Sequence, residues 1–262
     1  MEPSRIYSLL QDRIGLDIDS IGPAMVSRAI KSRMDATGIR DEQAYFGALK
    51  VSPVEMNELI EQVVVHETWF FRGKESFQFL RRLALSEYSV QRNSLLHILS
   101  VACASGEEPY SIAMTLMEAG ITSDHFQIDA IDISETSMEK AKRGIYSIHS
   151  FRGTDPEFRE RYFEKTGDGW LLTPRIRKAV HFLQHNLIET PPSLKSVRYD
   201  VIFCRNLLIY LNAAARSKIL QLLHRILAPE GILFVGHAEA GFPVAPYFDT
   251  VRPLNAFAHR KR

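Results

Sequence analysis

Two neighbouring carboxylates, Glu107 and Glu108, stand where the central part of the chain changes character. They follow a run of small residues, 102–106, that ends an apolar segment at 96–101, and a helical pattern begins at the pair itself. Small side chains let a ligand approach the backbone, and open α/β sheets bind ligands where their strands end. The glycine spacing differs from the G-x-G-x-x-G fingerprint, and two carboxylates at a helix start would repel a pyrophosphate. The loop predicts a positively charged nucleoside ligand without phosphates, which describes S-adenosylmethionine (SAM), or else an ordinary strand-to-helix corner.

Further polar residues close the apolar segments that follow. Asp132 ends one of them about 30 residues after the loop, where an acidic residue typically holds ribose hydroxyls. A buried charge at a strand end needs a partner, which favours ligand binding over packing. Asn186 and Leu187 follow the run HFLQ, so an amide and an apolar contact can frame an adenine, unless the asparagine only forms a turn. Arg205 and Asn206 close another segment and should point into the same crevice.

Tyr210 stands four residues beyond Asn206, one helical turn further along. The sequence contains no convincing pair of nucleophile and base, and no cluster of Cys and His at metal-ligand spacing, so we expect no metal. Cys103 and Cys204 lie in apolar runs and are expected to be buried free thiols of a reducing compartment.

The elements that must position these residues fall into three predicted parts. Residues 1–72 show helical patterns without a convincing strand, and one helix there places five apolar residues on a single face: Met25, Val26, Ala29, Ile30 and Met34. Ser52, Pro53 and Glu55 form a capping-box signature at the start of another helix. Residues 73–92 continue as a linker helix rich in Leu and Arg.

Residues 93–262 alternate strand and helix patterns. This alternation predicts βαβ units, a parallel sheet and right-handed crossovers, hence an α/β fold. One stretch, about 160–182, departs from the pattern. There TGDG, WLLT and then TPRIRKAVHFLQ predict a hairpin or small antiparallel sheet inserted into the α/β domain.

Composition limits the classes of partner. The 262 residues, 45% of them hydrophobic, suit one large domain or a small domain joined to a medium one. Lys and Arg number 32 against 31 Asp and Glu, so no net field favours nucleic acid or a membrane. The start lacks a basic region followed by an apolar core, and no segment approaches the ~18 apolar residues of a transmembrane helix. We therefore expect a cytoplasmic monomer that binds neither nucleic acid nor membranes.

Five motifs occur in order along the chain: HETWFFR at 66–72, ASGEEPYSIA at 104–113, AIDIS at 130–134, FCRNLLIY at 203–210 and GHAE at 236–239. As a set, they resemble the CheR family of chemoreceptor glutamate methyltransferases over nearly the whole chain. One motif alone is a weak signal, because class I methyltransferases share the strand-end aspartate. The family often has GHSE where this chain has GHAE.

The resemblance implies a class I SAM-dependent methyltransferase with a Rossmann-like sheet, a small N-terminal all-helical domain and an inserted antiparallel β-subdomain. It implies a protein-glutamate O-methyltransferase that forms methyl esters on the cytoplasmic helices of a chemoreceptor, releases S-adenosylhomocysteine and serves adaptation in two-component signalling. By the family pattern, Arg72 and Tyr210 would flank the transferred methyl as catalytic residues. The SAM pocket would be lined by His66, Thr68, Arg72, Glu108, Asp132, Asn186, Leu187, Arg205 and Asn206.

The family pattern matches two positions of this chain less directly. His66 stands where the family more often has an asparagine or a similar residue. Spacing alone does not separate Glu107 from Glu108, and we expect the second to face the pocket.

The chemistry of a glutamate acceptor agrees with this residue set. A glutamate carboxylate is ionised near pH 7, so its attack on a sulfonium methyl needs no general base. Carboxylate and sulfonium neutralise each other in the transition state, so catalysis rests on a desolvated site, proximity and in-line orientation. Arg72 would orient the carboxylate and Tyr210 would donate a hydrogen bond. The alternatives are an arginine stacked on Trp69 or Phe71 and a core tyrosine.

Other readings of the chain stay open. The face with Arg28 and Lys31, near Arg33 and Arg40, can meet an acidic receptor helix or can be an ordinary solvated face.

The protein can instead be a SAM methyltransferase of another substrate, although ETPPS at 189–193 is not the motif of amino-methylating nucleic-acid enzymes. It can also be a module that binds SAM or a receptor without turnover. The receptor, its glutamates and the motility or other output are not specified by the sequence.

Overall fold

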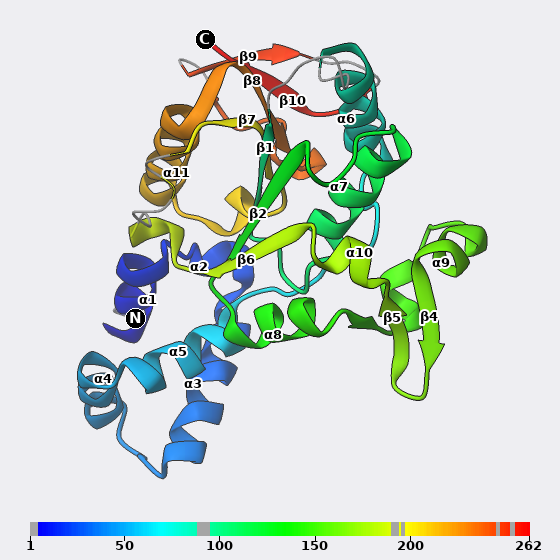
Figure 1. Ribbon diagram of the computed structural model, residues 1–262. Coiled ribbons are helices and arrows are strands. Elements are labelled where there is room, and N and C mark those ends of the chain that lie inside the picture. The colour runs from blue at the N-terminus through cyan, green and yellow to red at the C-terminus, as the bar shows by residue number, and fades with distance from the viewer. Residues whose placement is uncertain (1–4, 88–94, 190–193, 195–196, 245–246, 252–254) are drawn as a thin grey trace.

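The computed structural model describes residues 5–87, 95–189, 194, 197–244, 247–251 and 255–262. Its first part is helical, as predicted, and packs around its own apolar core. Figure 1 shows these helices gathered at one end of the molecule. They are α1 (Arg5–Ile14), α2 (Ile18–Ile21), α3 (Pro23–Thr37), α4 (Glu42–Val51) and α5 (Pro53–Val63).

The apolar face predicted for α3 is largely confirmed. Val26, Ala29 and Ile30 are buried, and Met34 packs against them, because residues at these spacings share one face of a helix. Met25 was expected on the same face, and that prediction is wrong, because its side chain is 37% exposed at the beginning of the helix.

The capping box of α5 is only half formed. The Ser52 hydroxyl accepts the N–H of Glu55 at 3.2 Å, as the signature predicts. The Glu55 carboxylate does not reach back to the cap and instead bonds Arg33, with a shortest distance of 2.6 Å, and the Tyr45 hydroxyl at 2.7 Å. Glu55 thereby joins α3, α4 and α5, and the hydrogen bonds from Arg33 hold the pKa of its carboxyl below the usual range.

The second part of the chain is built on a seven-stranded sheet in the order β6-β2-β1-β7-β8-β10-β9. The first five strands in this order are parallel, and β10 and β9 are antiparallel. Their bounds are β1 (Leu96–Val101), β2 (Phe126–Asp132), β6 (Val180–Gln184), β7 (Tyr199–Cys204), β8 (Leu227–Val235), β9 (Phe248–Val251) and β10 (Ala258–Lys261). The predicted parallel α/β sheet is confirmed.

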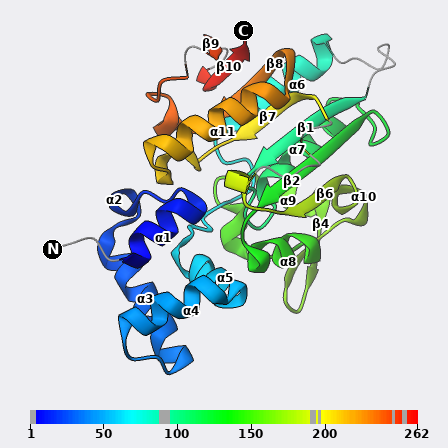
Figure 2. The ribbon, with the colours of Figure 1, turned by 90° about the vertical axis from the view of Figure 1, so that its left-hand side faces the viewer.

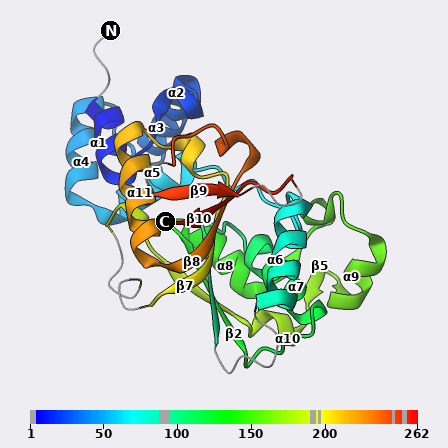
Figure 3. The ribbon, with the colours of Figure 1, turned by 90° about the horizontal axis from the view of Figure 1, so that it is seen from above.

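Helices cover both faces of this sheet. Ile98 joins the core under α6 (Lys74–Glu87), α7 (Glu107–Glu118) and α8 (Glu135–Arg143), whereas its neighbour Leu99 joins the core under α11 (Ala213–Ile226). Successive strand residues point to opposite faces, so the continuous apolar runs of these strands follow from double coverage. Figure 3 shows α6 and α7 on one side of the sheet and α11 on the other.

A small antiparallel sheet lies beside the main one, as predicted. It has the order β3-β5-β4, with β3 (Ile145–Tyr146), β4 (Phe163–Thr166) and β5 (Gly169–Leu172), and α9 (Pro156–Tyr162) precedes its hairpin. The end of the predicted insertion is wrong. After α10 (Pro174–Arg177), residues 180–184 form β6 of the main sheet, where Ile128 pairs with Val180. A short alternating run has the same pattern in both sheets, so only pairing with β2 decides its place.

The segment HETWFFR connects the two parts of the chain. Phe70 is 1% exposed and packs in an aromatic cluster with Tyr146, Phe151 and Phe163, at ring-centroid distances of 4.8, 5.3 and 5.0 Å. Boundaries after residues 72 and 92 stay a proposal, and residues 88–92 lie outside the described residues.

The N-terminal helices contact the end of the sheet through backbone bonds. Asp17 donates its N–H to the Tyr210 carbonyl at 2.8 Å, and Asn212 donates to the Gly15 carbonyl at 2.8 Å. Figure 2 shows the helical part lying against this end of the sheet, next to α8. No helix in the described part of the chain is long and apolar enough to cross a membrane. Cys103 and Cys204 are buried free thiols, as predicted.

Candidate active site

The loop between β1 and α7 turns sharply at the end of the sheet. Ala102 and Ala104 have φ of 54° and 47°, a conformation that costs energy for residues with a Cβ. Gly106 has φ of 92°, and a Cβ there would lie 2.8 Å from the Ala141 Cβ. Cys103 donates its N–H to the carbonyl of Ile131 at the end of β2. The loop is thereby held between β1 and β2, and α7 begins at its acidic pair, as predicted.

Asp132, at the end of β2, holds this loop from the other side. Its Oδ2 accepts the Ala104 N–H at 2.7 Å and its Oδ1 accepts the Ser134 N–H at 2.9 Å. Burial raises the pKa of Asp132, and these two backbone bonds oppose the rise. Each carboxylate oxygen accepts more than one hydrogen bond, so the group keeps capacity for ligand hydroxyls.

The two neighbouring glutamates have different surroundings. Glu108 Oε2 pairs with Arg205 Nη1 at 3.0 Å, and its Oε1 accepts the Ser100 hydroxyl at 2.8 Å. Glu107 instead turns away from the pocket and accepts the hydroxyls of Ser105 and Ser150. Burial raises the pKa of both carboxyls. Only the second glutamate therefore faces the pocket, where its side chain is 12% exposed.

Gly73 makes room for the Arg205 guanidinium. Its φ is +68°, and a Cβ at this position would collide with Arg205 Nη2. A side chain here would press on the guanidinium that pairs with Glu108, so the glycine after HETWFFR provides both the left-handed conformation and the space.

Glu239, within GHAE, sets the course of the loop after β7. Its carboxylate is 1% exposed and accepts three backbone N–H groups, those of Asn206 at 2.9 Å, Leu208 at 2.7 Å and Gly236 at 2.6 Å. Asn206 has φ of 60°, a left-handed conformation that asparagine adopts more readily than most residues, and the bonds from Glu239 hold the loop in it. The short 3-10 helix Leu208–Tyr210 follows directly and presents Tyr210 to the pocket.

Asn186 forms a turn at the end of β6. Its Oδ1 accepts the Ile188 N–H at 3.1 Å, and its Nδ2 donates to the Arg13 carbonyl of α1 at 2.7 Å. The alternative that Asn186 forms a turn is therefore confirmed. The residue still lines the pocket beside Leu187, with one amide hydrogen and one lone pair to spare.

HETWFFR passes over the open side of these loops. The His66 ring lies between the Ser137 hydroxyl, at 2.8 Å from Nδ1, and the Glu61 carbonyl, at 3.2 Å from Nε2. Arg72 donates to the Glu67 carbonyl at 2.8 Å and stacks on Trp69, with Cζ 4.4 Å from the ring centroid. The stacking considered from sequence is therefore present, and four of the five guanidinium N–H groups keep no other bond among the described residues.

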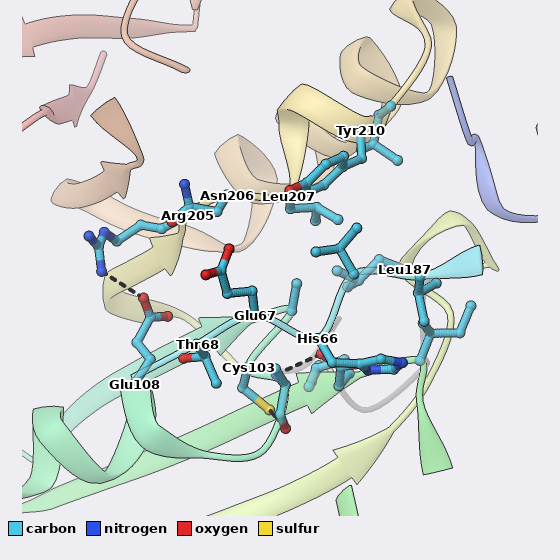
Figure 4. A pocket seen from close by; sticks show the side chains of 18 of the residues that line it. His66, Glu67, Thr68, Cys103, Glu108, Leu187, Arg205, Asn206, Leu207 and Tyr210 are labelled. Carbon is cyan, nitrogen blue, oxygen red and sulfur yellow. Dashed lines mark hydrogen bonds and ion pairs between the residues drawn. The ribbon is translucent and has the colours of Figure 1, made fainter. Parts of the chain in front are cut away.

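These segments enclose one pocket of about 1130 Å³, part of it open to solvent. Figure 4 shows Glu108 and Arg205 paired on one side, Tyr210 on another, and His66 and Leu187 toward the far end. All ten residues named from the sequence line it: His66, Thr68, Arg72, Glu108, Asp132, Asn186, Leu187, Arg205, Asn206 and Tyr210. Their individual roles stay predictions.

The pocket fits SAM by its charges and walls. Glu108 and Arg205 offer a carboxylate and a guanidinium side by side, which match the ammonium and the carboxylate of an amino acid. Asp132 suits ribose hydroxyls, and apolar side chains such as Ile131 and Leu187 suit an adenine ring. No group of three His, Cys, Asp or Glu in the described residues is arranged to hold a metal ion.

Sequence reasoning missed two residues at this site. Glu239 lies four residues after the apolar run that ends at Val235, and a carboxylate so close to a strand end can signal a buried acceptor. Glu67, within HETWFFR, also lines the pocket, and no spacing rule distinguishes it from a solvated surface residue.

Comparison with known proteins gives two family matches. The CheR methyltransferase, all-alpha domain matches residues 1–64, and the CheR methyltransferase, SAM binding domain matches residues 66–252.

Individual relatives of this chain are also named as methyltransferases. The chain is 44% identical over 237 residues to "Probable biofilm formation methyltransferase WspC" of Pseudomonas aeruginosa, covering 90% of this chain and 56% of that protein. It is 33% identical over 240 residues to "Chemotaxis protein methyltransferase 1" of the same species, covering 88% and 87%. It is 32% identical over 243 residues to "Chemotaxis protein methyltransferase" of Salmonella typhimurium, covering 90% and 82%. The chain spans little more than half the length of the WspC protein.

Both family matches lie where the structure places the two parts of the chain. The all-helical part precedes a mostly parallel sheet with a small antiparallel sheet beside it, and SAM is the cofactor of the domain that contains the parallel sheet. The chain belongs to the CheR methyltransferase family.

Proposed function

We propose that this protein transfers a methyl group from SAM to glutamate side chains on the cytoplasmic helices of a chemoreceptor. The observation that carries the proposal is the pocket itself. It joins the carboxylate–guanidinium pair of Glu108 and Arg205, the acidic residue Asp132 and two groups suited to a carboxylate substrate, Arg72 and Tyr210.

The site residues act by orientation. Bound SAM supplies a methyl group on a positively charged sulfur. Arg72, half-buried and held by Glu67 and Trp69, directs its remaining N–H groups toward an incoming carboxylate. Tyr210, whose backbone is tied to the N-terminal helices, donates a hydrogen bond to the same group. The substrate is already ionised, so no base is needed, and orientation in a desolvated pocket lowers the barrier.

The N-terminal helices support the docking of an acidic receptor helix. Arg28, Lys31 and Arg40 are exposed, and none forms an ion pair within the described part of the chain. The expectation that Arg33 belongs to this surface is wrong, because its side chain is 16% exposed and bonds Glu55. Methylation of a receptor's cytoplasmic helices would take place in the cytoplasm. All residues that line the pocket belong to one copy of the chain, which supports the proposal of a monomer.

Transfer of labelled methyl from SAM to a chemoreceptor cytoplasmic fragment, followed by mild alkali, tests this function. We expect label on the fragment that alkali releases, because a carboxyl methyl ester hydrolyses readily. Stable label would indicate another substrate group. SAM binding without label would indicate the non-catalytic module, and no SAM binding would contradict the assignment of the pocket.

The higher identity to the WspC protein favours a biofilm-related output over motility. Expression in Pseudomonas aeruginosa strains that lack either WspC or Chemotaxis protein methyltransferase 1 tests this output. We expect recovery of biofilm formation in the first strain and no recovery of swimming chemotaxis in the second. The reverse result would assign the protein to motility.

A further inference from the structure

A second guanidinium contacts two residues that line the pocket, Trp69 and Glu67. Arg152 follows the short 3-10 helix Ile148–Phe151, and its Cζ lies 3.8 Å from the ring centroid of Trp69. Arg72 stacks on the same indole at 4.4 Å. Trp69 and Arg72 line the pocket, so a segment from beside the small sheet brings a cation next to the group proposed to receive the substrate.

Arg152 already holds a carboxylate in the free protein. Its Nη2 lies 2.7 Å from Oε1 of Glu67, and Figure 4 shows the Glu67 carboxylate directed into the pocket. The hydrogen bond from Arg152, assisted by the charges of Arg152 and Arg72, lowers the pKa of Glu67. An ionised carboxylate of this chain therefore stands where an acidic substrate must pass.

This ion pair can exchange partners readily. The side chains of Arg152 and Glu67 are 49% and 58% exposed, and exposed pairs of this kind contribute little to stability. The ion pair of Glu108 and Arg205 differs, because its side chains are only 12% and 7% exposed. It is costly to break, since a buried charge would lose its partner. A competing carboxylate from a substrate can thus replace Glu67 without disturbing the fold.

We propose that Arg152 is a second substrate-binding cation, which Glu67 holds in the free enzyme and which binds an acidic side chain beside the target glutamate. This inference rests on the proposed function. Arg72 receives the reacting carboxylate, whereas Arg152 selects for acidic neighbours and is not itself a catalytic residue. Glu67 competes with the substrate for Arg152, and a substrate segment with few acidic residues does not displace it.

Steady-state transfer to the receptor fragment, with its concentration varied, tests the assignment. We expect Arg152→Ala to raise KM about tenfold and to leave kcat within about twofold, because only substrate docking loses a contact. Arg152→Lys should recover most of the KM, and Glu67→Gln should lower KM about twofold to threefold. A fragment whose acidic residues beside the target are replaced by Asn and Gln should show no KM penalty with Arg152→Ala.

Arg262→Ala is the matched control. Arg262 pairs with Asp249 at 2.6 Å, with side chains 52% and 60% exposed, at the edge of the sheet far from the pocket. Its removal should leave KM unchanged. A KM for Arg152→Ala within twofold of wild type, or an equal penalty on the neutralised fragment, overturns the proposal.

Fragment binding in the presence of S-adenosylhomocysteine separates this inference from the proposed function, because binding needs no transfer. If the wild type binds the fragment but transfers no methyl, the function fails while a tenfold weaker Kd for Arg152→Ala still supports the docking residue. If the wild type does not bind the fragment, the docking proposal is overturned.

Discussion

The carboxylate of Glu239 binds the backbone N–H of Asn206 at 2.9 Å, across 33 residues of sequence. The same side chain also binds the N–H of Leu208. One buried acid, in the short 3-10 helix His237–Glu239 that follows β8, thus fixes the conformation of the loop that carries Arg205 and Tyr210. Two groups on opposite sides of the pocket, Arg205 and Tyr210, depend on it.

Replacement of Glu239 should therefore weaken both SAM binding and methyl transfer. We expect Glu239→Gln to lower the free energy of unfolding by about 1–3 kcal/mol, because an amide NH₂ would face a buried N–H donor. SAM affinity and kcat should both fall, since Arg205 and Tyr210 move together. Denaturant unfolding and calorimetric SAM titration measure these changes. Glu230→Gln, at an exposed residue, should change neither, and full activity in Glu239→Gln would contradict the positioning role.

Gly73→Ala should weaken SAM binding through Arg205. The matched control is Gly38→Ala, because Gly38 has φ of +72° against +68° but has no atom within 4 Å of an added Cβ. Both variants should lose about 1–2 kcal/mol of stability from the left-handed backbone. Only Gly73→Ala should also weaken SAM binding, by about tenfold, because the added Cβ would displace the guanidinium that pairs with Glu108. Equal SAM affinities in the two variants would show that Arg205 tolerates the methyl group.

Arg72 and Tyr210 should matter for transfer far more than for SAM affinity. We expect Arg72→Ala to lower kcat about 100-fold and Tyr210→Phe about tenfold, because each loses an interaction that orients the acceptor. The Kd for SAM should change less than about threefold in either variant. Initial rates with a receptor fragment and calorimetry of SAM binding separate the two effects. Unchanged rates in both variants would remove these residues from the mechanism.

Glu55 should make the stability of the helical part depend on pH. Its pKa is lowered in the folded protein by hydrogen bonds from Arg33, so ionised Glu55 stabilises the fold at pH above its unfolded value, and this contribution is lost as pH falls through the folded pKa. We expect Glu55→Gln to cost about 1–3 kcal/mol at pH 7. The difference from wild type should shrink below about pH 4.

Urea unfolding of both proteins at pH 7 and pH 3 measures this difference. Glu58→Gln is the control, because Glu58 contacts the same Arg33 at 3.1 Å but is 53% exposed. Its effect should stay below about 0.5 kcal/mol at either pH. A constant cost for Glu55→Gln across this range would mean that shape, rather than charge, explains its role.

Local patterns predicted much of this protein because they depend on residues close in sequence. Ser52 caps α5, α7 begins at Glu107, and Asp132 ends its strand, each because a backbone conformation is set within a few residues. Strand and helix periodicity predicted the α/β sheet, since double coverage by helices requires apolar strands. The order of five motifs predicted the family and the ten residues that line the pocket.

Contacts between distant segments were decided only by the tertiary structure. The sequence could not assign residues 180–184 to the main sheet, pair Glu108 with Arg205, or show that Arg33 contacts Glu55 instead of joining the basic surface. Each depends on which surface a side chain or strand meets after folding. The sequence by itself determined which chemical groups are present and on which helix, strand or loop each one lies. Packing decided which partner each group binds, because an unpaired charge or backbone group is costly to bury.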